Sequence, residues 1–185
     1  PRPLTDVSIK ADFAGDRVSV EQITGNYSQG NVRASGVLPL FEPLSPNDAD
    51  RETPLQIVLE QIRTNLRGIY RGGVDGNLTI RGHAFNPEIS GNIVLSQGQV
   101  ILDPNSAAMQ ASTASQTSSQ EQTFVTEFAD LTLTLGKNLR ITSPPVLNFV
   151  ATGDLQVGGT LDRLRPKGTV RLKSGQVNLF TTVFN

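Results

Sequence analysis

The sequence predicts an all-β fold, a meander of short antiparallel strands. Apolar and polar residues alternate along most of the chain, for example over residues 7–13 and 131–135. A period of two gives a strand one apolar face and one polar face. Seventeen glycines punctuate the alternating runs. We expect these glycines at strand ends, where a positive φ or a tight bend is required.

Two segments of the chain repeat each other without a gap. Residues 76–102 read GNLTIRGHAFNPEISGNIVLSQGQVIL, and residues 153–179 read GDLQVGGTLDRLRPKGTVRLKSGQVNL. Nine of the 27 aligned positions are identical, whereas unrelated segments of this composition would share roughly one or two. A fixed repeat indicates an array of one supersecondary unit, here a strand, a glycine, a turn and another strand. Such arrays build long continuous surfaces rather than compact catalytic pockets.

The strands are expected in a regular order along the chain. The first covers residues 7–13, and residues 30–36 form a weaker third copy of the opening half of the repeat. The two full copies and the stretch between them supply the others, around residues 78–80, 93–95, 100–102, 131–135, 155–157, 170–172 and 177–179. We assign all 185 residues to a single domain.

Two polar segments interrupt the pattern. Residues 42–53 contain two prolines and several acidic residues, and they are expected to form a polar loop. Residues 103–123 are rich in Ser, Thr, Gln and Ala, without periodicity. This composition predicts a flexible insertion between two strands.

The segment Leu55–Leu66 carries signals for both a helix and a strand. Thr53 and Pro54 suit a helix N-cap and first helical position, and the apolar residues that follow fit helical spacing. The alternation of Leu55, Ile57 and Leu59 also fits a strand. Local signals favour a helix, whereas the surrounding pattern favours a strand.

Composition excludes several functional classes. The net charge is −1 and no basic patch stands out, so a nucleic-acid partner has little electrostatic support. Cysteine is absent and His83 is the only histidine, which excludes a thiolate site and any histidine-based triad. We expect His83 in a solvated loop, and the aspartates beside glycines in turns. The sequence therefore predicts neither an enzyme nor a cofactor.

The chain contains no apolar run long enough for a membrane-spanning helix and no signal peptide. Because it starts at Pro1, we expect it to be a piece of a longer protein. The apolar strand faces themselves have two interpretations. Composition favours an ordinary core between two packed sheets, but spacing does not distinguish such a closed sandwich from an open groove.

Several motifs together resemble one known family. They are residues 68–82 (GIYRGGVDGNLTIRG), 87–91 (PEISG), 96–100 (SQGQV), 131–135 (LTLTL), 153–159 (GDLQVGG) and 168–175 (GTVRLKSG). In this order they resemble the C-terminal conserved domain of TamB, the inner-membrane subunit of the translocation and assembly module of bacterial envelopes. Residues 174–180 (SGQVNLF) resemble the branch with cyanobacterial members and their chloroplast-envelope relative. The resemblance covers nearly the whole chain and is weaker before Leu55.

The resemblance implies an elongated, twisted and half-open trough, a β-taco or half-pipe with an apolar concave face. Residues 55–66 would then be a strand. Full-length members would be anchored in the inner (plasma) membrane and extend through the periplasm or intermembrane space. They would carry lipids, phospholipid or glycolipid, between the membranes. They would also support outer-membrane biogenesis and protein secretion together with an outer-membrane barrel partner.

On this interpretation the apolar strand positions line a lipid groove and supply contact area rather than recognition. A chaperone-like module that binds outer-membrane proteins through its edge strands is one alternative, and a structural sandwich is another. The expected lining residues are Leu78, Ile80, Ile93, Leu95, Val100, Leu102, Leu131, Leu133, Leu135, Leu147, Phe149, Leu155, Val157, Val170, Leu172, Val177 and Leu179.

Overall fold

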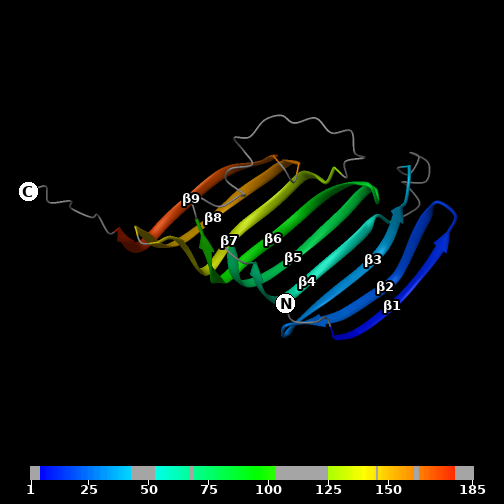
Figure 1. Cartoon of the computed structure of the whole chain (residues 1–185), viewed down its shortest axis with the longest axis horizontal. Helices are drawn as coiled ribbons and strands as arrows, with labels where there is room; N and C mark the ends of the chain where they lie inside the picture. Colours follow the sequence, from blue (N-terminus) through cyan, green and yellow to red (C-terminus); the bar gives the residue numbers. More distant parts are fainter. Residues whose placement is uncertain are drawn as a thin grey trace, which may run out of the picture.

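The computed structural model describes residues 5–42, 53–66, 69–102, 125–144, 146–160 and 163–177. These residues form one sheet whose nine strands follow the sequence order (Figure 1). The strands are β1 (Thr5–Ala14), β2 (Arg17–Tyr27), β3 (Gly30–Pro39), β4 (Leu55–Leu66), β5 (Tyr70–His83), β6 (Asn86–Ile101), β7 (Glu127–Ser143), β8 (Leu147–Thr160) and β9 (Arg163–Val177). The all-β prediction is confirmed, but the strands, of 10 to 17 residues, are not short.

The sequence predicted an antiparallel sheet, and this prediction is wrong for one pair of strands. Seven neighbouring pairs are antiparallel, whereas β6 and β7 run parallel, with Glu88 opposite Glu127 and Ile101 opposite Thr142. Parallel neighbours need a connection of a dozen or more residues, because the chain must return to the starting end of the first strand. The predicted insertion, residues 103–123, falls in this connection. It lies outside the described residues, as do residues 43–52 of the other polar loop.

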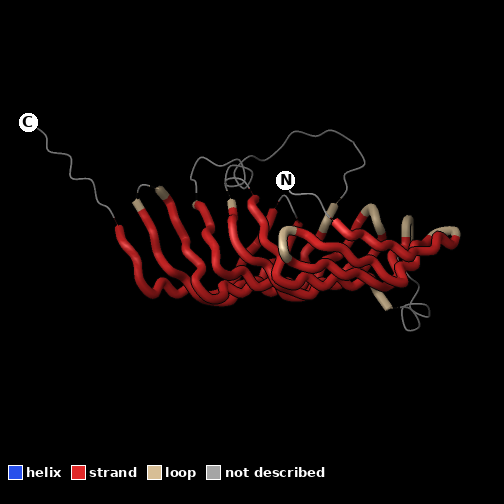
Figure 2. The backbone as a smooth tube through the Cα atoms, turned by 90° about the horizontal axis from the view of Figure 1, so that it is seen from below, coloured by secondary structure: helices blue, strands red, loops and turns tan. Residues whose placement is uncertain are grey.

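The sheet is open. β1 and β9 lie at its two edges and do not pair with each other, and all nine strands belong to a single layer. The alternative of a closed sandwich is therefore wrong for the described part of the chain. Figure 2 shows this single layer from the side, where the strands curve in the manner of a trough. The predicted half-open trough is confirmed as the shape of the sheet.

The segment Leu55–Leu66 is strand β4, and the prediction of a strand is confirmed. It pairs with β3 on one side and with β5 on the other, where Ile57 lies opposite Leu78. A helix of this length is marginal on its own in water. Ladders of partners on both sides therefore outweigh the local capping signal of Thr53 and Pro54.

The two copies of the repeat form equivalent pairs of strands. Leu78 lies opposite Gly91 between β5 and β6, and Leu155 lies opposite Gly168 at the same offset between β8 and β9. These glycines are inside strands, not at strand ends as predicted. A Cβ atom on Gly91 or Gly168 would overlap a carbonyl oxygen of the adjacent strand. The repeated glycines therefore permit close approach of two backbones.

β-Bulges bend the long strands. Gln61 in β4, Gln97 in β6 and Asn138 in β7 have φ between 47° and 55° at sites where the register shifts. The bulges of β6 and β7 lie side by side, because the pairing resumes on both strands where Gly98 meets Leu139. Bulges bend and twist a strand, so this group of bulges curves the sheet.

The described residues bury a small hydrophobic core. Leu139 and Ala151 are fully buried, and they pack with Tyr70 and Leu135 across β5, β7 and β8. In contrast, every residue of β9 is exposed. The sheet thus has a packed centre and an open end.

Candidate functional site

One row of directly opposed residues crosses all nine strands without a polar side chain. In a sheet, directly opposed residues share a face. From β1 to β9 the row consists of Ile9, Ile23, Ala34, Ile57, Leu78, Gly91, Leu131, Val157 and Pro166. We call the side of the sheet that carries this row the ladder face.

The register places fifteen of the seventeen predicted lining residues on the ladder face. Strand β8 defines the face because it has no bulge of its own, so its side chains alternate regularly. Every second residue of β8, from Leu147 to Gly159, lies on the ladder face, and the predicted lining residues of β7 and β9 lie opposite these residues. Leu102 follows the end of β6 and is 39% exposed, and Leu179 lies outside the described residues. The fifteen are Leu78, Ile80, Ile93, Leu95, Val100, Leu131, Leu133, Leu135, Leu147, Phe149, Leu155, Val157, Val170, Leu172 and Val177.

Sequence reasoning missed part of this face. Strands β1 to β4 extend it with Ile9, Ile23 and Ile57. The alternation around Ile9 and Ile57 was visible but was not connected to the later strands, and Ile23 was missed. Leu139, the most deeply buried side chain, was missed as well. Leu139 is in phase with residues 131–135, but the apolar run is interrupted by Lys137 at the intervening position, so the run was read as ending at Leu135.

The two faces of the sheet differ in burial and in polarity. All buried hydrophobic residues of the described chain lie on the ladder face: Val20, Ile62, Tyr70, Leu131, Leu135, Leu139 and Ala151. On the opposite face, polar side chains bond across the strands. Thr134 donates to Asp154 at 2.7 Å, and the Gln156 amide donates to Thr132 at 3.0 Å.

The two ends of the ladder face are exposed to solvent. On β1, Ile9 and Phe13 are 63% and 79% exposed, and on β9, Leu172 and Val177 are each 50% exposed. Contiguous exposed apolar surface on a soluble domain usually marks a site of interaction. The ladder face therefore offers apolar contact area that the described residues do not cover.

Tyr70 contributes a buried polar atom on the ladder face, and this atom has a partner. Its hydroxyl donates to the carbonyl oxygen of Gly73 at 2.6 Å and lies 3.2 Å from that of Ser96. Burial raises the pKa of the Tyr70 phenol. The phenol is thus neutral at physiological pH and adds no charge to the face.

His83 is placed differently from the expectation of a solvated loop. It is the last residue of β5, lies opposite Asn86 and is half-buried. Its Nδ1 atom is buried without a hydrogen-bond partner among the described residues. Within the same residues, no three His, Cys, Asp or Glu side chains are grouped to hold a metal ion, and no helix is long and apolar enough to cross a membrane.

Comparison with known proteins identifies the family. The family model of the TamB C-terminal domain matches residues 21–185, which is most of the chain. The chain belongs to the TamB C-terminal domain family. The predicted resemblance is thereby confirmed.

Two relatives of the TamB-family chain are plant proteins. Protein SUBSTANDARD STARCH GRAIN 4, chloroplastic, from Oryza sativa subsp. japonica is 26% identical, over 97% of this chain and 10% of the relative. Protein TIC236, chloroplastic, from Arabidopsis thaliana is 25% identical, over 98% of this chain and 11% of the relative. Both agree with the predicted chloroplast branch of the family. The chain spans about a tenth of the length of these relatives, and no solved structure gave a significant match.

Proposed function

We propose that this TamB-family chain is a non-enzymatic segment of a cell-envelope protein, and that its ladder face is the concave lining of a trough for lipid acyl chains. The observation that carries the proposal is the row of apolar residues through all nine strands. Such a row supplies a continuous path across the sheet without a polar interruption.

The burial pattern supports a concave ladder face. In a single-layer sheet no second layer covers either face, so the burial of one face requires its side chains to converge on the inside of a bend. The buried hydrophobic residues Leu131, Leu135 and Leu139 follow this face along the bent strand β7. The polar residues between them, such as Thr132 and Thr134, then cover the convex side.

The physical benefit of such a trough is large. Exposure of an acyl chain to water costs about 0.8 kcal/mol per methylene, hence about 11 kcal/mol for a chain of about 14 methylenes. A continuous apolar lining removes most of this cost, while the head group stays in water at the open side. Movement along the lining requires no covalent chemistry, because neighbouring positions are nearly equal in energy.

In this proposal the full-length protein is anchored in the inner (plasma) membrane and extends through the periplasm or intermembrane space. Its partners are phospholipid or glycolipid acyl chains and an outer-membrane barrel that assembles or translocates proteins. The family match and the two chloroplast relatives support an envelope location and a role in translocation. Neither a cofactor nor a nucleic acid takes part.

A charge placed on the ladder face tests the proposal. Leu133 lies opposite Ile93 and Leu155 on the ladder face, whereas Thr132 lies opposite Asn92 and Gln156 on the other face. We expect Leu133→Lys to weaken binding of a fluorescent fatty acid by about tenfold or more, because one ammonium offsets the transfer of several methylenes. Thr132→Lys, the matched control with the same added charge, should bind as the wild type does.

Circular dichroism of both variants separates a binding defect from a folding defect. Equal binding by wild type and Leu133→Lys, with both folded, would contradict an acyl-chain lining. If Leu133→Lys unfolds, Leu172→Lys at the half-exposed position on β9 gives the same test with less demand on the fold.

A second candidate is a chaperone-like role in which the edge strands pair with unfolded outer-membrane proteins. The observation that favours it is the edge strand β9, which pairs only with β8 among the described residues and is exposed along its length. Strand addition uses backbone hydrogen bonds at a free edge. This role therefore depends on the backbone of β9 rather than on the side chains of the ladder face.

A further inference from the structure

An open cavity of about 960 Å³ with a distinct chemistry lies beside the β2–β3 turn. Its lining comes from the β2–β3 turn and from strands β4 to β7, and it includes Arg63, Arg71 and Arg140. No carboxylate and no aliphatic side chain belong to this lining. Three cations without an acid are a local excess in a chain whose net charge is −1.

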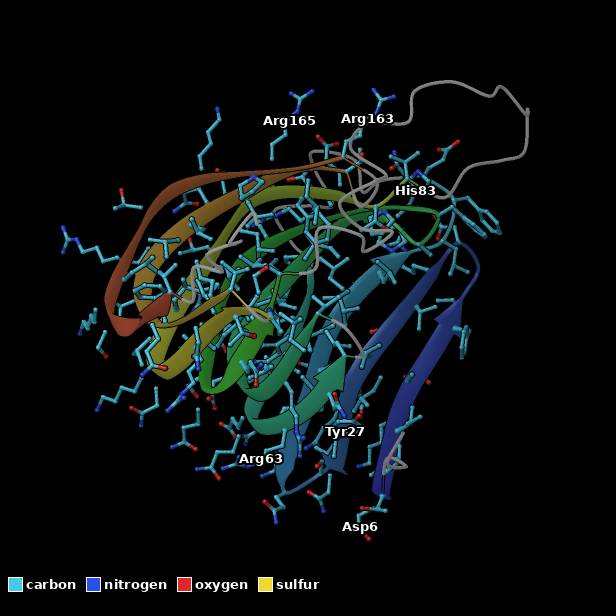
Figure 3. All side chains as sticks on the ribbon, turned by 60° about the vertical axis from the view of Figure 1, so that its left-hand side comes forward. Asp6, Tyr27, Arg63, His83, Arg163 and Arg165 are labelled. Carbon is cyan, nitrogen blue, oxygen red and sulfur yellow. The ribbon has the colours of Figure 1, made fainter. Side chains whose placement is uncertain are left out.

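The three arginines project from the face opposite the ladder face. Each directly follows a residue whose side chain lies on the ladder face, namely Ile62, Tyr70 and Leu139, and successive side chains of a strand point to opposite sides. The guanidinium groups of the cavity are therefore on the other side of the sheet from the apolar row. Tyr27 and Thr64, which also line the cavity, lie on the ladder face by the register. Figure 3 shows Tyr27 and Arg63 at the same rim of the sheet, where both line the cavity.

Two of the cations share one row of the sheet. Arg71 lies opposite Gln99, which lies opposite Arg140. Adjacent strands are about 4.8 Å apart, so the Cα atoms of the two arginines are separated by about 10 Å. From this spacing two extended guanidinium groups can reach one bound anion. Neither has an ion-pair partner among the described residues, whereas Arg63 donates to the Gln97 side-chain oxygen at 3.0 Å.

The neutral part of the lining indicates what the anion carries. It contains five side-chain amides, among them Gln29, Asn65 and Gln99, as well as the hydroxyl groups of Tyr27 and Ser28. Amides offer both donors and acceptors and therefore suit ligand hydroxyl groups. Guanidinium groups bind phosphate or sulfate oxygens in a bidentate manner.

We infer that this cavity binds a phosphate- or sulfate-class oxyanion that carries hydroxyl groups. The arginines hold the oxyanion, and the amides orient the hydroxyl groups beside it. The same chemistry is found in a lipid head group and in a soluble sugar or glycerol phosphate. The site does not depend on the proposed function of the ladder face, because the three arginines that hold the oxyanion project from the other side of the sheet.

Titration of the 185-residue chain with glycerol 3-phosphate, and separately with phosphatidylglycerol vesicles, tests the site. The variant Arg71→Gln/Arg140→Gln should weaken binding by about tenfold or more at low salt, because two charge-assisted pairs are lost together. Arg81→Gln is the matched control. It removes one exposed arginine from the same strand and the same face, at a position outside the cavity lining.

The outcomes are distinct. Arginine-dependent binding of glycerol 3-phosphate supports a soluble ligand, and arginine-dependent binding of the vesicles alone supports a lipid head group. Equal losses in the single variants Arg81→Gln and Arg71→Gln would show that only the overall charge matters, and would overturn the site. Failure of the folded wild type to bind either probe would overturn it as well. Arg71→Lys/Arg140→Lys, which keeps the charges, should restore binding in part.

Discussion

Gly91 allows β5 and β6 to approach each other closely because it has no Cβ atom. Its φ is +124°, and a Cβ atom there would overlap the Asn77 carbonyl oxygen on β5. We predict that Gly91→Ala lowers the free energy of unfolding by about 1–3 kcal/mol, measured by urea denaturation. Gly158→Ala is the control, because its added Cβ would lie 3.6 Å from the nearest atom, the Phe128 carbonyl oxygen. Equal stability of the two variants would contradict this explanation of the repeated glycines.

Tyr70 makes the stability of the sheet depend on pH in the alkaline range. Burial raises the pKa of its phenol above the ordinary value of 10.0, so the folded state holds this proton more tightly than the unfolded state. The contribution of Tyr70 is therefore complete below pH 10 and decreases as the pH rises through the raised folded-state pKa. The free energy of unfolding of Tyr70→Phe should be about 1 kcal/mol lower than that of the wild type at neutral pH. It should also lose less stability than the wild type as the pH rises above 10, and an identical alkaline decrease in both proteins would contradict the prediction.

At the scale of residues, the sequence identified the recurring glycines but not their function. A glycine inside a strand and a glycine at a strand end look alike in a single sequence. Gly91 is distinguished only by its partner Leu78, and this pairing depends on the register between β5 and β6. The cationic cavity was also missed, because Arg63, Arg71 and Arg140 are scattered in the sequence and come together only through strand pairing.

At the scale of elements, alternation predicted the strands but not how they pair or bend. The same period of two describes parallel and antiparallel neighbours, so nothing in residues 86–101 or 127–143 indicated that β6 and β7 run parallel. The bulges were equally invisible. Gln97 and Asn138 adopt positive φ without being glycine, because the pairing on both sides imposes that conformation.

The edge strand β9 allows a test of the second candidate function. Pro166, which has no backbone N–H, lies within β9 opposite Val157. Antiparallel pairs alternate between hydrogen-bonded and non-bonded positions, and no register shift separates Pro166 from Val170. Val170→Pro should therefore leave the β8 ladder intact. Val170 is also one of the expected lining residues, and because proline keeps an apolar side chain there, we predict a much smaller loss of fatty-acid binding than in Leu133→Lys. In contrast, Thr169→Pro removes an N–H directed at β8 and should lower the melting temperature of the protein, measured by thermal denaturation.

Loss of binding to an unfolded outer-membrane protein in Val170→Pro, with fatty-acid binding retained, would favour the chaperone-like role. If Val170→Pro loses fatty-acid binding as fully as Leu133→Lys does while it stays folded, the prediction is contradicted.

At the scale of the whole molecule, the open shape could not be derived from composition or spacing. An apolar strand face looks the same whether a second sheet or a bound ligand covers it, and composition alone favoured the sandwich. The resemblance over residues 68–175 indicated the trough instead, and the single sheet confirms that shape. The lining role of residues such as Leu133 and Leu172 stays a prediction.

The central proposal is that lipid acyl chains occupy the ladder face, and photocrosslinking in the native envelope tests it most directly. Crosslinking residues replace Leu133 and Leu172, and Thr132 and Arg171 serve as controls whose side chains point to the other face. We predict lipid adducts at the two leucine positions and none at the controls. Protein adducts along β9 with no lipid at either leucine, or equal lipid labelling at all four positions, would contradict the proposal.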